Sequence, residues 1–107
     1  MSEFNKREEG FEKKFALDEE QKFRAEARRN RLLGLWAAEK LGITGEAATA
    51  YAKEVVAADF EEAGDGDVLR KVMADFAARH VAITEQAIRA KMSEFIAVAA
   101  AEVKSGK

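Results

Sequence analysis

A dense cluster of basic side chains lies between positions 22 and 31 of the sequence. It consists of Lys22, Arg24, Arg28, Arg29 and Arg31. The four that we consider as a possible phosphate site, here called the basic cluster, are Lys22, Arg24, Arg28 and Arg31. On a helix, Arg24, Arg28 and Arg31 follow the i, i+4, i+7 pattern and share one side, where guanidinium groups can hold a phosphate or a partner's carboxylates. The cluster therefore predicts either a phosphate site, with an adenine nucleotide as the candidate ligand, or a solvated face that pairs with Glu20 and Glu26.

No catalytic motif accompanies this cluster. The sequence has no cysteine and a single histidine, which excludes a thiol nucleophile, a disulfide and a thiolate metal site. A phosphate-binding loop, a dinucleotide-binding glycine pattern and an HExxH pair are absent as well. We interpret His80 as a cap or surface residue, and the acidic run from Asp59 to Asp67 as capping and solvation, because the closing glutamate of a calcium loop is missing. We expect a protein that is not an enzyme and uses neither metal nor cofactor.

The first sixteen residues differ in composition from the remainder. Their large apolar groups are Phe4, Phe11 and Phe15, which fall on one narrow side of a helix among charges of both signs. Gly10 interrupts this helix and costs roughly 1 kcal/mol relative to alanine. The pattern predicts a flexible segment over 1–16 that becomes a helix in a partner's groove; the alternative is a helix that folds back onto the chain's own core.

Residues 17–107 carry a repeated helical pattern. The sequence has no proline, and apolar residues recur at helical spacing over about 17–41, 45–63, 67–76 and 84–103. Gly42 suits the end of the first helix and Thr84 the start of the last. We expect an all-α fold, a small four-helix bundle. The predicted stripe of the first helix contains Phe23, Ala27, Leu33, Ala37 and Leu41, with Leu32, Leu35 and Trp36 beside it as core or docking residues. We expect the second half of this helix to be largely buried.

Charge and hydropathy limit the partners. The formal net charge is -2, so no positive field would attract nucleic acid. No apolar run approaches the roughly 18 residues of a membrane span, and the charged N-terminus lacks the apolar core of a secretory signal. We expect a soluble cytoplasmic protein that does not insert into a membrane and is a monomer when free, with a helical homo-oligomer as the alternative.

Two stretches carry a resemblance to a known family. They are KFALDEEQKFRAEARRNRLLGLWAAEKLG, from Lys14 to Gly42, and AYAKEVVAADFEEAGDGDVLRKV, from Ala50 to Val72. The chain resembles the zeta subunit of alphaproteobacterial F-type ATP synthases, an ATPase inhibitor, over essentially its whole length. The part from Ala27, ARRNRLLGLWAAEKLG, is the most specific.

The resemblance implies a four-helix protein whose N-terminal segment enters an interface of the catalytic subunits and blocks rotation in the direction of ATP hydrolysis. The partner is then the catalytic sector of the synthase, on the cytoplasmic side of the inner membrane. The segment maps to about residues 2–15, with Phe4, Phe11 and Phe15 as apolar anchors. Its basic residues, expected to pair with acidic groups of the synthase, are Lys6, Arg7, Lys13 and Lys14.

Overall fold

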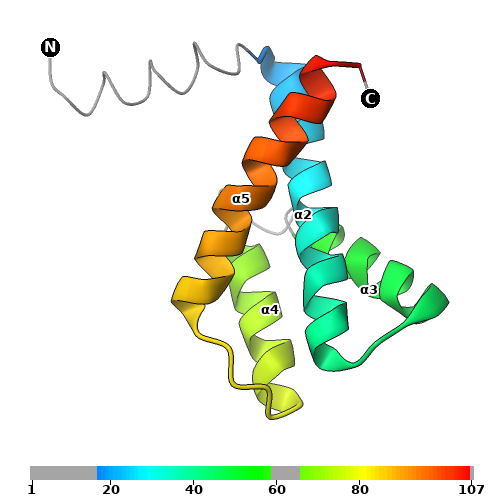
Figure 1. Cartoon of the computed structure of the whole chain (residues 1–107), viewed down its shortest axis with the longest axis vertical. Coiled ribbons are helices and arrows are strands. Elements are labelled where there is room, and N and C mark those ends of the chain that lie inside the picture. The colour runs from blue at the N-terminus through cyan, green and yellow to red at the C-terminus, as the bar shows by residue number, and fades with distance from the viewer. Residues whose placement is uncertain (1–16, 59–65, 107) are drawn as a thin grey trace, which may run out of the picture.

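The computed structural model of the chain describes residues 17–58 and 66–106, which form four helices (Figure 1). These are α2 (Glu19–Leu41), α3 (Gly45–Ala58), α4 (Gly66–Ala78) and α5 (Glu85–Lys104). The longest helix, α2, packs against both α3 and α5, so it is the central element of the bundle. The predicted all-α four-helix bundle is confirmed. None of the described helices is long and apolar enough to cross a membrane.

The ends of the helices follow the local chemistry of the sequence. Asp18 accepts a hydrogen bond from the backbone N–H of Gln21 at 2.7 Å, and the Gln21 side chain accepts one from the Asp18 N–H at 3.2 Å. This capping box fixes the start of α2. Gly42 ends α2 in the left-handed conformation, with φ 79°, and Thr84 caps α5 by accepting from the Ala87 N–H at 3.1 Å. The predictions for Gly42 and Thr84 are confirmed.

Two sequence-based boundaries cannot be compared with the structure. The second helix was predicted to reach about residue 63; α3 is described up to Ala58, and positions 59–63 lie outside the described residues. The division into a segment over 1–16 and a bundle over 17–107 likewise stays a prediction, because residues 1–16 lie outside the described residues.

The main core lies where all four helices meet, a region here called the four-helix part. Its largest fully buried apolar side chains are Leu33, Val55, Val68, Val72, Phe76 and Ile88. Trp36 is half-buried, and its ring meets that of Phe76 edge to face at a centroid distance of 5.8 Å. Trp36 therefore contributes to the core, although part of its side chain stays in contact with solvent.

Gly34 allows α2 and α3 to cross at very short distance. A Cβ atom at position 34 would lie 2.7 Å from the Cα of Ala52 and 3.2 Å from a methyl of Val55. Real Cβ atoms do not approach a backbone atom so closely, so only glycine fits at this crossing. The glycine in the LLGLW stretch is thus explained by helix packing.

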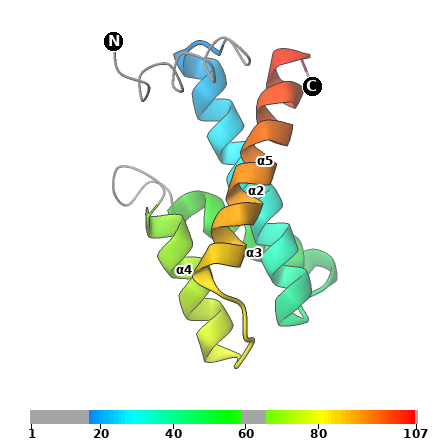
Figure 2. The ribbon, with the colours of Figure 1, turned by 60° about the vertical axis from the view of Figure 1, so that its left-hand side comes forward.

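Beyond this core, the N-terminal part of α2 and the C-terminal part of α5 extend past α3 and α4 (Figures 1 and 2). We call these stretches, residues 19–28 and 96–104, the projecting pair. They are held together by a smaller cluster in which Ala25, Ala99 and Val103 are buried, with Leu17 and Ile96 at its edge. Phe23 belongs to the predicted apolar stripe but lies in the first half of the helix, and its side chain is 57% exposed, because α3 and α4 do not extend along this part of α2. Leu35 is exposed too.

Candidate functional site

The basic cluster lies along α2, as predicted, but two of its arginines already have partners within the chain. Arg24 pairs with Glu20 at 2.9 Å, one helical turn away. Arg28 reaches across to Glu102 of α5 at 3.3 Å and so joins the two helices of the projecting pair. A phosphate would have to displace these carboxylates. The pairing with Glu20 is the one that the alternative interpretation, a solvated face, predicted, and nucleotide binding by the cluster stays a prediction.

Two polar residues of α2 are buried, which the sequence analysis did not predict. Asn30 is fully buried and Arg29 is 8% exposed. The Arg29 Nε donates to Asn30 Oδ1 at 3.1 Å. Arg29 belongs to the same basic run as Arg28 and Arg31, and nothing in the sequence separates it from them, since its burial results from the way α5 packs over α2.

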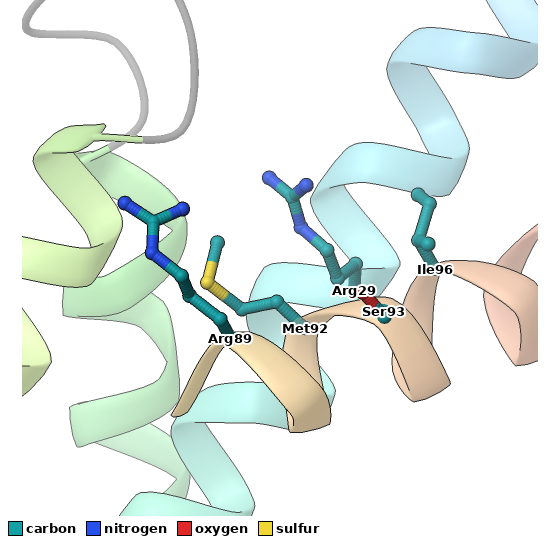
Figure 3. Close-up of a pocket in the computed structure, with 5 residues that line it drawn as sticks. All are labelled: Arg29, Arg89, Met92, Ser93 and Ile96. Carbon is teal, nitrogen blue, oxygen red and sulfur yellow. The ribbon is translucent and has the colours of Figure 1, made fainter. Parts of the chain in front are cut away.

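Arg29 lines a cavity of about 270 Å³ between α2 and α5 (Figure 3). The remaining lining residues, from α5, are Arg89, Met92, Ser93 and Ile96. Figure 3 shows the side chains of Arg29 and Arg89 on either side of Met92, with both guanidinium groups directed the same way. Two guanidinium groups at one cavity can bind an anion, but Arg89 is engaged by Glu85 through a 3.0 Å hydrogen bond. No member of the basic cluster lines this cavity.

Arg31 lies at a second cavity, of about 260 Å³, between α2 and α3. The other residues around it are Thr49, Ala52, Lys53 and Val56 of α3. This places Arg31 beside Lys53, a residue far from the basic cluster in the sequence. The structure therefore separates the cluster: Arg28 points to α5, and Arg31 borders α3.

A polar network joins α3 to α4 at Tyr51. The Tyr51 hydroxyl donates to Asp75 Oδ2 at 2.7 Å, and Lys71 Nζ donates to the same oxygen at 3.1 Å and to Glu54 at 3.2 Å. Burial, the hydrogen bond to Asp75 and the charges of Asp75 and Glu54 raise the pKa of the Tyr51 phenol well above its usual value. Burial lowers the pKa of Lys71, but the same two carboxylates more than offset this and raise it overall. All four groups are thus satisfied by one another, as expected of a structural network.

The other sequence-based site predictions have simpler outcomes. His80 is exposed and ends α4 in the left-handed region, with φ 58°, which confirms its interpretation as a surface or cap residue. Among the described residues, no group of three or more His, Cys, Asp or Glu side chains is arranged to hold a metal ion. The predicted inhibitory residues lie outside the described residues: Phe4, Lys6, Arg7, Phe11, Lys13, Lys14 and Phe15.

A model of the family described as ATPase inhibitor subunit zeta matches residues 1–102. The chain belongs to this family. The resemblance seen in the sequence is thereby confirmed, and the match includes both the N-terminal segment and the helical part. No curated protein matches the chain.

The zeta-family chain is also similar to a solved structure, described as a solution NMR structure. The two are 52% identical and superpose with a TM-score of 0.69, over 79% of this chain and 96% of the other. The similarity therefore covers most of both chains and extends to the fold of the helical part.

Proposed function

We propose that this chain is a non-enzymatic inhibitor of ATP hydrolysis by the F-type ATP synthase. The observation that supports this is the match of the zeta inhibitor family over residues 1–102. The partner is the catalytic sector of the synthase, which would hold the protein on the cytoplasmic side of the membrane. The sequence lacks a phosphate-binding loop, a dinucleotide-binding glycine pattern and an HExxH pair, which agrees with a binding protein.

The segment over 1–16 supplies the inhibitory contact in this proposal. Phe4, Phe11 and Phe15 enter an apolar groove at an interface of the catalytic subunits, and the basic residues of the segment pair with acidic groups around it. Ordering such a segment costs several kcal/mol, which the burial of the three rings must exceed. Inhibition by this route is reversible, since no covalent step takes part.

The helical part serves as the anchor. Its core consists of residues from α2, α3, α4 and α5, among them Leu33, Val55, Phe76 and Ile88. Because these side chains are buried by one another, we expect the helical part to fold without the segment and to act as a monomer.

We do not propose nucleotide sensing by the basic cluster as the function. To bind a phosphate, Arg24 would have to release Glu20 and Arg28 would have to release Glu102. The net gain in binding free energy is small when one anionic partner replaces another.

The test is a titration of ATP hydrolysis by the isolated catalytic sector with the full chain and with residues 17–107. The full chain should inhibit, and the shortened chain should not. Circular dichroism of the shortened chain is the control, since its helix content must be retained. Equal inhibition by both chains would rule out the segment as the inhibitory part, and no inhibition by the full chain would contradict the proposed function.

A further inference from the structure

The cavity between α2 and α3 combines an apolar floor with a basic rim. Ala52 is buried and Val56 is half-buried, whereas Thr49, Lys53 and Arg31 are exposed around them. We call this cavity the α2/α3 groove. It arises beside the short crossing at Gly34, because the small side chains that permit the crossing do not fill the space next to it.

The two cations at the rim differ from several other basic residues of the bundle, which are paired within the chain. Arg24, Arg28, Lys71 and Arg89 are each held by a carboxylate of the chain. Within the part of the chain that the structure describes, Arg31 and Lys53 form no ion pair, and no carboxylate lines the groove between them. The groove thus presents two unneutralised charges next to apolar surface.

We propose that the α2/α3 groove docks an acidic amphipathic segment of a protein partner. An apolar side chain of this segment fills the space over Ala52 and Val56, and carboxylates that flank it pair with Arg31 and Lys53. The choice of the catalytic sector of the synthase as that partner rests on the proposed function. The groove would then be the anchoring contact of the helical part, separate from the inhibitory contact of residues 1–16.

The volume of the groove and the two cations at its rim both favour an acidic amphipathic segment as the occupant. A cavity of about 260 Å³ accommodates a single large apolar side chain. Two cations from different helices suit carboxylates spaced along a helix, and the guanidinium of Arg31 can bind one of them with two parallel hydrogen bonds. Charge complementarity of this kind raises the association rate and selects the partner.

The experiment measures binding of the full-length protein to the immobilised catalytic sector. The first variant is Arg31→Glu/Lys53→Glu, and the matched control is Lys40→Glu/Lys104→Glu, which makes the same change in net charge at exposed residues away from the groove. A second variant, Thr49→Trp, fills the groove without changing its charge. We expect both groove variants to bind at least tenfold more weakly and the control to bind within about twofold of the wild type. Melting curves establish that all variants are folded.

Two further results separate the groove from the proposed function. If the wild type inhibits the sector but the groove variants bind as tightly as the wild type, the groove is not a docking site, although the function stands. If the groove variants bind weakly yet inhibit fully at saturating concentration, docking and inhibition are separate contacts, as proposed.

If the wild type does not bind the sector, the proposed function fails and the groove is tested alone. The probe is a synthetic helical peptide with leucine at every fourth position and glutamate between. Its addition to the full ¹⁵N-labelled chain should shift the amide signals of Thr49 and Lys53, and a peptide with lysine in place of glutamate should not. No shift with the acidic peptide at millimolar concentration would overturn the inference. The inference would also be overturned if Phe4→Ala/Phe11→Ala/Phe15→Ala shifted the amide signals of Thr49 and Lys53 in the free protein. Such a shift would mean that the groove holds the chain's own N-terminal segment.

Discussion

The four-helix part and the projecting pair are built from the same two long helices, α2 and α5, but are held together differently. In the four-helix part, α3 and α4 cover α2 and α5, so large side chains such as Leu33, Phe76 and Ile88 are fully buried. In the projecting pair the seam between the helices contains Ala25, Ala99 and Val103, and the partly exposed ion pair between Arg28 and Glu102 crosses it.

This difference in packing indicates which region of the molecule unfolds locally at the lowest free energy. Local unfolding occurs at lower free energy where few apolar contacts are lost. The projecting pair buries small side chains, so it should open before the four-helix part. Residues 1–16 precede this end of α2 in the sequence, so the proposed inhibitory segment is joined to the less stable region and the proposed anchoring groove lies on the more stable one.

The largest expected effect distinguishes two phenylalanines. Phe76→Ala removes a ring that is 1% exposed, and it should lower the free energy of unfolding by about 3 to 5 kcal/mol. Phe23→Ala removes a ring that is 57% exposed in the projecting pair, and it should cost less than about 1 kcal/mol. Urea unfolding followed by circular dichroism measures both. Similar losses for the two variants would contradict the contrast between the regions.

A matched pair of valines sharpens the same comparison. Val72→Ala in the four-helix part should lower the free energy of unfolding by about 2 kcal/mol. Val103→Ala in the projecting pair should lower it by about 1 kcal/mol, because the two helices there can move together and close the space that the deleted methyl groups leave. Amide hydrogen exchange adds a regional readout. Val103→Ala should accelerate exchange at the C-terminal end of α5 alone, and faster exchange throughout the molecule would show that the two regions unfold together.

Gly34→Ala tests the crossing on which the four-helix part depends. Alanine in a helix interior normally stabilises by about 1 kcal/mol relative to glycine. Here the added Cβ would lie 2.7 Å from the Cα of Ala52, so overpacking should outweigh that gain and leave a net loss of about 1 kcal/mol. A higher melting temperature for the variant would mean that α2 and α3 do not approach this closely.

The smallest effect concerns the polar network between α3 and α4. Tyr51→Phe removes the hydrogen bond to Asp75 and should cost about 1 kcal/mol at neutral pH. The pKa of Tyr51 is higher in the folded than in the unfolded chain, so the associated stability is complete below about pH 10 and is lost as the pH rises above that value. The raised pKa of Lys71 acts in the same direction. Urea unfolding between pH 8 and 11 should therefore show a steeper loss for the wild type than for the variant, and parallel curves would contradict the raised pKa of Tyr51.

Local features of the fold were predictable from the sequence. Gly42 and Thr84 end and begin helices through chemistry that involves only their neighbours along the chain, so their roles were predicted correctly. The helical period likewise identified Leu33, Ala37 and Leu41 as buried. The exposure of Phe23 could not be predicted in the same way, because the period shows which side of α2 is apolar but not how far α3 and α4 extend along it.

The candidate sites were less predictable, because they depend on which helices meet. The cavity with Arg29 and Arg89 and the α2/α3 groove with Arg31 and Lys53 each combine residues from two helices. No spacing in the sequence relates these residues. The spacing of Arg24, Arg28 and Arg31 placed them on one side of α2, but carboxylates of Glu20 and Glu102 engage two of them.

The most direct test of the proposed division between inhibitory segment and anchor is a competition experiment. ATP hydrolysis by the catalytic sector is titrated with the wild type in the presence of excess Phe4→Ala/Phe11→Ala/Phe15→Ala protein. We predict that the triple variant alone does not inhibit, and that its excess moves the wild-type titration to higher concentration because its helical part occupies the same docking site. Inhibition by the triple variant equal to that of the wild type, or a wild-type titration unaffected by its excess, would contradict the division.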